Sequence, residues 1–398
     1  MFANLTMAPP DPILGLTEAF NQERNPAKIN LGVGVYQDDS GKTPVFSSVK
    51  KAEKRLLEQE ATKNYLPISG SPKYAAAVQQ MLFGAGHSAI DQKRAATIHA
   101  PGGTGALRVA GDFLKQFAVP GAKIWVSDPT WSNHIGVFQA AGFEIGKYPY
   151  YDASSKGLDF EAMIKAMRGI PKGHIPLLHA CCHNPSGIDP DMEQWSAIAA
   201  AVKERELIPL FDFAYQGLAH GIEEDAAPVR MFADLGVDML VASSFSKNFG
   251  LYNERVGALT VVADSADSAE KALSHMKTVV RANFSNPPSH GGAIVETILS
   301  DPELKREWEG EVAAMRDRIR SMRERFVKTL AAKGVDRDFS FIARQNGMFS
   351  FSGLTEAQVK ALRDRYAIYI VSNGRINVAG MTSGNIERLC EAIADVLK

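Results

Sequence analysis

VASSFSKNFGLYNERVG, residues 241–257, is the stretch from which the fold and the chemistry of this chain can be worked out. It starts within an apolar run, residues 239–245, that has the length and composition of a buried strand. Small polar residues follow, and then come Lys247 and Arg255. Most lysines are solvated. A lysine just past a buried strand, near another cation, loses its proton more easily and becomes a nucleophile toward carbonyl groups.

The side chains around Lys247 are of the kinds that bind phosphate. Ser244 and Ser246 offer hydroxyl groups, and Arg255 offers a guanidinium group. An amine beside a phosphate site is typical of a Schiff-base lysine that holds pyridoxal 5'-phosphate (PLP). The same pattern fits a surface lysine that follows a strand, so partners elsewhere in the chain must decide between the two interpretations.

The composition is that of an ordinary globular protein. The 398 residues are enough for two domains, with 45% hydrophobic and 22% charged residues. Because the net charge is -1, no overall field attracts nucleic acid or an anionic membrane. We expect no membrane span, since no run of about 18 apolar residues occurs. We expect no signal peptide, since the N-terminus lacks a basic start and an apolar core.

Cysteine and histidine usage points to a reducing compartment without a metal site. Cys181, Cys182 and Cys390 show no CxxC spacing, so we expect no structural disulfide and a cytoplasmic location. The nine histidines show no paired-ligand spacing, and we expect no metal.

Short apolar runs alternate with helical runs between residues 97 and 262. The expected strands are 96–100, 123–127, 144–150, 175–181, 207–213, 239–245 and 258–262. The expected helices among them are 105–117, 133–141, 160–167 and 192–203. This alternation predicts an α/β fold with a mainly parallel sheet that helices cover on both faces. Ligands then bind beyond the carboxyl ends of the strands.

The flanking parts of the chain have a different organisation. Residues 1–43 form an irregular arm, with a short helix near 12–22 and a strand-like run at 29–36. Helical spacing recurs at 47–60 and 72–83, and a long apolar stripe over 304–330 predicts one continuous helix. From Phe339 onward, smaller pieces predict an α+β domain. The predicted domains are 1–43 (arm and part of the small domain), 44–313 (large, ligand-binding) and 314–398 (small).

Residues 101–107, PGGTGAL, lie between a predicted strand and a predicted helix. Free N–H groups at a helix N-terminus bind phosphate, and glycine lets the anion approach closely. The alternative is a tight turn in which Thr104 caps the helix. The loop is neither a Walker A motif nor GxGxxG.

Asp212 is a carboxylate at the end of the apolar run LFDFAY. A buried carboxylate needs a cationic partner, and a protonated pyridine nitrogen is one. The alternative is an Asp that caps the next helix. Tyr215 could donate to the phenolate oxygen of the cofactor, or it could be a core tyrosine.

Two other strand ends carry candidates. Asn184, in CCHNPSG, could donate its amide to the phenolate oxygen and to a substrate carboxylate, although Asn-Pro-x-Gly is also common turn chemistry. Trp131 could stack on a planar cofactor or belong to the core. His134 could reach Asp212.

Arg281 and Arg375 are candidates for binding carboxylates, because an arginine guanidinium can bind a carboxylate through two parallel hydrogen bonds. Two such arginines would suit a dicarboxylic acid. The alternative for each arginine is a surface ion pair.

Together these motifs closely resemble the class I PLP-dependent aminotransferases, in their aspartate/aromatic subgroup. The matching segments, in family order over nearly the whole chain, are DPILGL (11–16), GKTP (41–44), TKNYL (62–66), GGTGAL (102–107), CCHNP (181–185), FDFAYQG (211–217), SKNFGLYNER (246–255), RANFSNPP (281–288) and GMFSF (347–351). The resemblance implies the fold type I architecture: a large domain with a mainly parallel seven-stranded sheet, and a smaller α+β domain.

The resemblance also implies a role for each candidate. Lys247 would bind PLP covalently and carry the proton of the substrate alpha carbon, with Asp212 at the pyridine nitrogen. The phenolate oxygen would be contacted by Asn184 and Tyr215, and the ring would be stacked by Trp131. The phosphate would be held by Gly103, Thr104, Ser244, Ser246, Arg255 and Tyr65 of the other subunit. The alpha-carboxylate would be held by Arg375, Asn184 and the Gly34 backbone, and the side-chain carboxylate by Arg281 of the neighbouring subunit.

The implied protein is a homodimer that moves an amino group from L-aspartate to 2-oxoglutarate by a ping-pong mechanism. An aromatic amino acid aminotransferase, or a dual-specificity enzyme, is the nearest alternative. The residues that look like the aspartate type are Val35, Thr43, Asn64, Thr104 and Asn286. Gln37 departs from that type, because a lysine is frequent there. A nicotinamide-dependent oxidoreductase is disfavoured, since no GxGxxG with a downstream acidic residue occurs, and a non-catalytic binding protein is disfavoured by Lys247.

Overall fold

The computed structural model describes residues 2–7 and 14–398. The chain forms two compact units, which are described separately below. The larger unit comprises Pro44–Asn184 and Ile188–Asp317, and the smaller one comprises Met1–Thr43, Pro185–Gly187 and Arg318–Lys398. The domains predicted from the sequence, 1–43, 44–313 and 314–398, remain a prediction.

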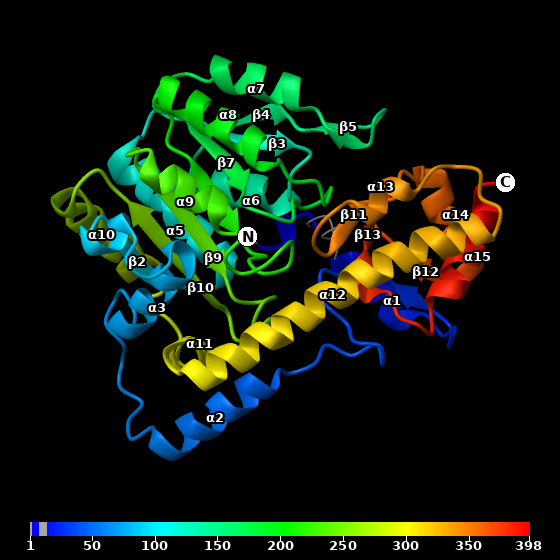
Figure 1. Ribbon diagram of the computed structural model, residues 1–398, viewed down its shortest axis with the longest axis horizontal. Coiled ribbons are helices and arrows are strands. Elements are labelled where there is room, and N and C mark those ends of the chain that lie inside the picture. The colour runs from blue at the N-terminus through cyan, green and yellow to red at the C-terminus, as the bar shows by residue number, and fades with distance from the viewer. Residues whose placement is uncertain (1, 8–13) are drawn as a thin grey trace. The chain divides into compact units, whose positions relative to one another are not determined.

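The larger unit is built on a seven-stranded sheet, which confirms the predicted α/β class (Figure 1). Each of the seven expected apolar runs contributes one strand. The strands in spatial order are β2 (Ala95–Pro101), β10 (Val256–Val262), β9 (Met239–Ser244), β8 (Leu210–Phe213), β7 (Ile175–His179), β3 (Ile124–Asp128) and β4 (Ile145–Pro149). All neighbours are parallel except that β10 is antiparallel to both β2 and β9.

Helices cover both faces of this sheet, which explains why its strands read as continuous apolar runs. One group consists of α5 (Gly102–Phe113), which contacts both α6 (Ser132–Ala140) and α10 (Ala266–Asn283). The other series consists of α3 (Pro72–Phe83), α9 (Ala227–Asp234), α8 (Met192–Glu204) and α7 (Phe160–Gly169). Core residues such as Ile98, Val109 and Ile124 are fully buried between them.

The rest of the larger unit is peripheral to the sheet. Its elements are α2 (Ser47–Gln59), α4 (Ser88–Asp91), the π-helical turn η2 (Leu114–Ala118), the β5 (Tyr151–Asp152) and β6 (Gly157–Leu158) hairpin, and α11 (Ser289–Ser300). The long helix expected from the apolar stripe is confirmed as α12 (Pro302–Ala332). Its stripe residues, which recur every three or four positions, are buried: Leu304, Trp308, Val312, Met315, Ile319, Met322, Phe326 and Leu330.

The smaller unit mixes helices with short strand pairs, which confirms the predicted α+β character. Its elements are η1 (Phe2–Asn4), α1 (Leu14–Gln22), β1 (Ile29–Asn30), α13 (Ser340–Ala343), β11 (Phe349–Phe351), α14 (Glu356–Tyr366), β12 (Ile368–Tyr369), β13 (Arg375–Asn377), η3 (Val378–Gly380) and α15 (Ile386–Val396). Strand β1 pairs in parallel with β12, and β11 pairs antiparallel with β13.

Several expected boundaries differ from the structure, most by one to three residues. The strand expected over 29–36 ends at Asn30, because Asn377 takes the carbonyl groups of Val33 and Val35 that a strand would pair with a neighbour. Helix α5 begins at Gly102 rather than Gly105. For the helix expected near 12–22, the described part begins at Leu14, and its start lies outside the described residues.

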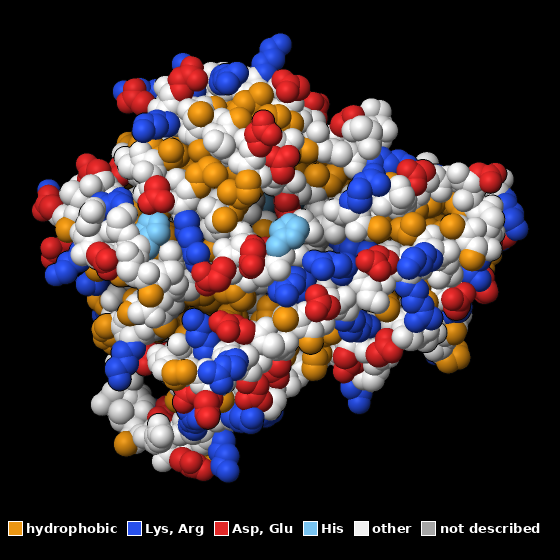
Figure 2. Space-filling model, viewed as in Figure 1, with side chains coloured by type: hydrophobic (Ala, Val, Ile, Leu, Met, Phe, Trp, Pro, Cys, Tyr) orange, Lys and Arg blue, Asp and Glu red, His pale blue; other side chains and the backbone are white. Residues whose placement is uncertain are grey.

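The surface carries both signs of charge. On the face shown in Figure 2, Lys and Arg side chains are interspersed with Asp and Glu side chains. Of the helices that the structure describes, none combines the length and the apolar character needed to cross a membrane.

Candidate active site

Most candidate residues of the larger unit gather at one edge of the seven-stranded sheet. Strands β2, β9, β8, β7 and β3 all end at this edge, and the antiparallel strand β10 begins there. Gly257 of β10 pairs with Ala100 of β2 and with Ser244 of β9. The turn that precedes β10 therefore brings Arg255 beside Ser244 and the first turn of α5.

A cluster that we call the phosphate cradle consists of Gly102, Gly103, Ser244, Ser246 and Arg255. Its residues are closely packed. Gly102 has φ of 75°, and a Cβ on it would collide with the Arg255 guanidinium group. A Cβ on Gly103 would lie 2.9 Å from Ser244 Cβ. The Ser244 and Ser246 hydroxyl oxygens are 3.3 Å apart. Two hydroxyls and a guanidinium thus face a helix N-terminus, which is a suitable site for an anion.

The alternative interpretation of this loop, in which Thr104 caps the helix, is wrong. The residue before the helix is Pro101, and no side chain makes a capping hydrogen bond there. The N–H groups of the first turn of α5 are therefore not taken by a side-chain cap, and Thr104 lies inside the helix.

Lys247 is half-buried directly after β9, with its Nζ 4.8 Å from the centre of the Tyr215 ring. Burial lowers the pKa of Lys247, the charge of Asp212 opposes this, and the charge of Arg255 adds to it. The lowered pKa favours a neutral amine, which is the nucleophilic form.

The residue after Lys247 anchors this loop. Asn248 is buried and donates from Nδ2 to the Gln216 carbonyl oxygen at 3.1 Å, next to Tyr215. Trp308 of α12 donates from Nε1 to the Asn248 carbonyl oxygen at 2.7 Å. The lysine loop is therefore fixed both to the Tyr215 loop and to α12.

Asp212 lies in strand β8 and is held as a carboxylate. The prediction that His134 reaches it is confirmed: His134 Nε2 and Asp212 Oδ2 are 2.8 Å apart, and Thr130 Oγ1 is 2.8 Å from the other ring nitrogen. Burial raises the pKa of Asp212, but the His134 hydrogen bond and the nearby charges outweigh it, so that the pKa is lowered overall. The lowered pKa favours the carboxylate form of Asp212 at this edge of the sheet.

A buried histidine cluster extends behind Asp212, and the sequence analysis missed His179. The ring centre of His179 is 5.1 Å from that of His134 and 4.3 Å from that of His183. Burial lowers the pKa of His179 to about 3. The sequence placed His179 inside the strand expected at 175–181 and gave no strand order; in the structure His179 ends β7 and pairs in register with Asp212 of β8.

His134, His179 and Asp212 are also close enough to hold a metal, with ligand atoms within 4.8 Å of one another. The hydrogen bond between His134 and Asp212 occupies two of these atoms. Both ring nitrogens of His179 are buried without a hydrogen-bond partner in the described part of the chain, so His179 belongs to the group by proximity alone.

Trp131, Tyr215 and Asn184 follow the ends of β3, β8 and β7, respectively. Trp131 is half-buried just before α6, and its ring centre is 5.2 Å from that of His134. Tyr215 and Asn184 are buried, after β8 and β7. The larger unit thus brings Trp131 and Tyr215 to the group formed by Lys247 and Asp212.

Two predicted residues stay apart from this group in the described chain. The Tyr65 side chain is 90% exposed. Arg281 lies on the exposed last turn of α10, where its Nη1 donates to Ser285 Oγ at 2.5 Å.

In the smaller unit, Arg375 and Gly34 share an aromatic neighbour that the sequence analysis did not assign to the site. Arg375 is buried, its guanidinium carbon lies 4.4 Å from the centre of the Phe349 ring, and it donates to the Gly32 carbonyl oxygen at 2.7 Å. A Cβ on Gly34 would lie 2.9 Å from the tip of the same ring.

Comparisons with known proteins show the family to which the chain is similar. The model of the family Aminotransferase class I and II matches residues 26–393. The aspartate aminotransferases of Salmonella typhi and of Escherichia coli (strain K12) are each 56% identical to this chain, over 100% of both sequences. A solved aromatic-amino-acid aminotransferase from Burkholderia pseudomallei, covalently bound to pyridoxal phosphate, is 50% identical, with a TM-score of 0.98 over 100% of both chains.

Proposed function

The chain belongs to the class I and II aminotransferases, and we propose that it moves the amino group of L-aspartate to 2-oxoglutarate, giving oxaloacetate and L-glutamate. The observation that carries the proposal is the half-buried Lys247, which lies over Tyr215, near the carboxylate of Asp212 and next to the phosphate cradle. Full-length relatives at 56% identity that are named aspartate aminotransferase support the choice of donor.

PLP is the cofactor that we propose for this site. The cradle of Gly103, Ser244 and Arg255 has room for an anion only because glycine contributes no side chain there. Asp212, held as an anion, would pair with the pyridine nitrogen. When bound, PLP supplies an electron sink for bond changes at the substrate alpha carbon. The remaining contacts that we propose come from Thr104, Ser246, Asn184, Tyr215 and Trp131.

Lys247 would serve as covalent anchor and then as proton carrier. Its lowered pKa favours the neutral amine, which would accept the proton of the substrate alpha carbon and later return it. Because Asn248 and Trp308 hold the lysine loop, the amine returns to one position in each half of the ping-pong cycle.

Two arginines would read the two carboxylates of the substrate. We propose that Arg375, with Asn184 and the Gly34 backbone, holds the alpha-carboxylate. Arg281 would hold the side-chain carboxylate at the site of a partner subunit, and Tyr65 would reach the partner's phosphate. The exposure of Tyr65 and Arg281 supports a homodimer, as do the exposed apolar side chains of Phe2, Leu5 and Met7, which a partner would cover.

Preference for aspartate over aromatic donors is tested by comparing kcat/KM. Purified enzyme with 2-oxoglutarate as acceptor should have a larger kcat/KM for aspartate than for phenylalanine or tyrosine. A larger value for tyrosine would make the chain an aromatic amino acid aminotransferase, the alternative favoured by its likeness to the solved Burkholderia pseudomallei structure.

The cytoplasm is the location that we propose. Cys181, Cys182 and Cys390 are buried and form no disulfide in the part of the chain that the structure describes. Such cysteine usage is typical of reducing compartments. Cell fractionation with an activity assay tests this.

A further inference from the structure

The segment Leu31–Gln37 carries Gly34, and it is held against β13 by hydrogen bonds rather than by forming a strand. Its ends are fixed by backbone bonds: Asn377 N–H donates to the Leu31 carbonyl oxygen at 2.8 Å, and Gln37 N–H donates to the Ala379 carbonyl oxygen at 3.0 Å. Between these points the segment depends on side chains of β13.

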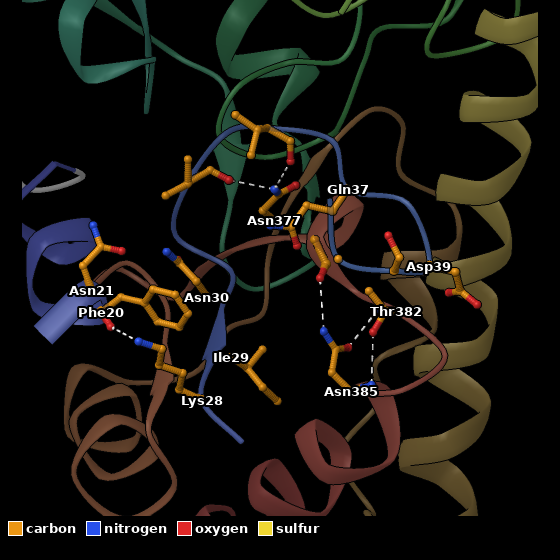
Figure 3. A pocket seen from close by; sticks show the side chains of 15 residues that line it. Phe20, Asn21, Lys28, Ile29, Asn30, Gln37, Asp39, Asn377, Thr382 and Asn385 are labelled. Carbon is orange, nitrogen blue, oxygen red and sulfur yellow. Dashed lines mark hydrogen bonds between the residues drawn. The ribbon is translucent and has the colours of Figure 1, made fainter. Parts of the chain in front are cut away.

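Asn377 supplies most of that side-chain support. Its Nδ2 donates to the carbonyl oxygens of Val33 at 2.7 Å and of Val35 at 2.8 Å (Figure 3). Its Oδ1 accepts from Ala379 N–H at 3.1 Å, and the residue is 1% exposed. A single buried amide therefore binds the carbonyl groups on both sides of Gly34.

The side chains of Arg375 and Asn377 lie on the same side of β13. They are two residues apart on the strand, which places their side chains on one face. Arg375 donates to the Gly32 carbonyl oxygen at 2.7 Å. The arginine proposed to bind the alpha-carboxylate and the amide that holds Gly34 thus belong to one element.

The Val33 hydrogen bond also determines where the Gly34 N–H points. The peptide between Val33 and Gly34 is trans, and in a trans peptide the C=O and the following N–H point in opposite directions. Glycine adopts many backbone conformations, so a peptide beside Gly34 needs an external restraint. Asn377 supplies this restraint. The Phe349 ring also packs against Gly34, where a Cβ would lie 2.9 Å from the ring.

We propose that Asn377 is a positioning residue for substrate recognition. It orients the Gly34 peptide so that this peptide and Arg375 together bind the alpha-carboxylate group that every amino acid and 2-oxo acid substrate carries. The inference rests on the proposed function. It gives Asn377 a different role from Arg281, because Arg281 is proposed to bind only the side-chain carboxylate.

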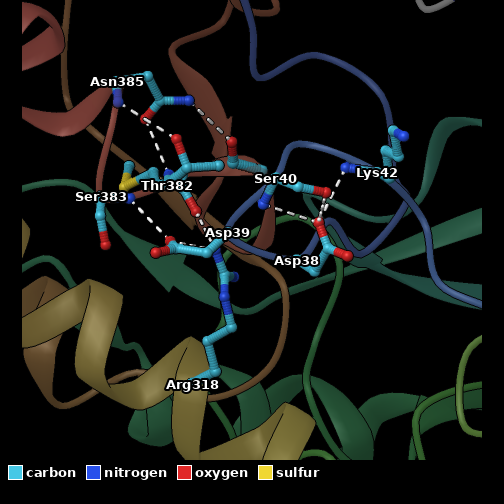
Figure 4. Close-up of polar contacts among 10 residues, drawn as sticks. Asp38, Asp39, Ser40, Lys42, Arg318, Thr382, Ser383 and Asn385 are labelled. Carbon is cyan, nitrogen blue, oxygen red and sulfur yellow. Dashed lines mark hydrogen bonds and ion pairs between the residues drawn. The ribbon is translucent and has the colours of Figure 1, made fainter.

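Asn385 offers a matched control in the same unit. Its Nδ2 donates to the Gly380 carbonyl oxygen at 3.2 Å, and its Oδ1 accepts from Thr382 N–H at 2.8 Å (Figures 3 and 4). Both asparagines line one cavity of about 400 Å³. Asn385 is thus another amide that holds backbone groups, but its hydrogen bonds do not reach Leu31–Gln37.

The experiment compares Asn377→Ala and Asn385→Ala as PLP-loaded enzymes. The KM values for aspartate, phenylalanine and 2-oxoglutarate should each rise about tenfold in Asn377→Ala, because a misoriented Gly34 peptide no longer donates to the alpha-carboxylate, and one lost hydrogen bond of about 1.4 kcal/mol corresponds to that factor. Asn385→Ala should keep the wild-type KM values. Both variants should keep the visible absorbance band of the bound cofactor.

A purely structural Asn377 would give a different pattern. Loss of folded enzyme lowers kcat and leaves KM unchanged, and that result overturns the inference, as does a KM rise for aspartate alone. If Asn377→Ala does not fold, Asn377→Ser gives the same comparison with one hydroxyl donor retained and a smaller rise. Wild-type enzyme that turns over no donor would overturn the proposed function itself, which distinguishes the two failures.

Discussion

Lys247 and Asp212 owe their chemistry to their neighbours. Burial and the charge of Arg255 lower the pKa of Lys247, and hydrogen bonding by His134 keeps Asp212 ionised in spite of burial. The sequence indicated both residues as candidates, because each stands at or just past the end of an apolar strand. The contribution of His179 was not, because it depends on which strands become neighbours.

Arg281 should control the choice between dicarboxylic and aromatic donors. We expect Arg281→Ala to lose about 100-fold in kcat/KM for aspartate, since removing one member of a buried charge pair costs about 2 to 5 kcal/mol. Phenylalanine has no second carboxylate, so its kcat/KM should change by a much smaller factor. Lys271→Ala, which removes another exposed cation of the same helix, is the control. Equal losses on both donors would make the role of Arg281 structural.

His179 should make the protein less stable in mild acid. Its pKa is about 3 in the folded chain, because burial disfavours the charged ring, and about 6.5 when unfolded. Below pH 6.5 the unfolded chain binds a proton that the folded chain does not, so acid favours unfolding. The free energy of unfolding should fall by about 2 kcal/mol between pH 7.5 and pH 5 through this residue.

Urea unfolding of the cofactor-free protein at both pH values measures this effect. The His179→Gln variant should lose about 2 kcal/mol less than the wild type over the same interval, because glutamine does not titrate. An identical pH dependence in the two proteins would show that His179 titrates normally in the folded state.

At the scale of elements, the site depends on how β2, β9 and β10 are arranged. The sequence predicted that all three are strands, and that α5 follows a glycine loop. It did not predict that β10 runs antiparallel between the other two, since an apolar run carries no information about direction. That direction brings Arg255 to the start of α5.

The cradle formed by these elements should not tolerate a side chain at Gly103. In Gly103→Ala a Cβ would lie 2.9 Å from Ser244 Cβ, so the start of α5 or the end of β9 must shift. We expect the dissociation constant of PLP to rise about tenfold, measured by titrating cofactor-free enzyme. Gly121→Ala is the control, because nothing lies within 4 Å of its Cβ. Unchanged PLP affinity in Gly103→Ala would remove Gly103 from the phosphate site.

Residues 31–37 show why local pattern is not enough. Alternating apolar residues favoured a strand, yet the two glycines of this segment and the Asn377 amide produce an irregular backbone that ends the strand at Asn30. Figure 4 shows the continuation of this segment, where Asp39 accepts hydrogen bonds from Ser383 N–H and from Arg318. Contacts between residues far apart in the sequence therefore determine the backbone path of this segment.

At the scale of the whole molecule, a shared active site predicts complementation. Lys247→Ala and Arg281→Ala should each be nearly inactive with aspartate as a homodimer. After the two are mixed under conditions that exchange subunits, half of the dimers become hybrid, and each contains one complete site. Activity should recover to about a quarter of the wild-type value.

Absence of recovery would show that Arg281 serves its own subunit or that subunits do not share sites. Size-exclusion chromatography of the mixture, with one variant carrying a tag, verifies that hybrids have formed. In the single chain Tyr65 and Arg281 are exposed, so the proposed sharing of sites needs this test.

The central claim is that Lys247 holds PLP and that the bound cofactor exchanges amino groups with aspartate. An absorbance titration tests it most directly. The purified wild-type enzyme should show a visible band that L-aspartate abolishes and 2-oxoglutarate restores, and Lys247→Ala should show neither the band nor the exchange. A colourless wild-type protein after incubation with PLP, or a band that aspartate leaves unchanged, would contradict the claim.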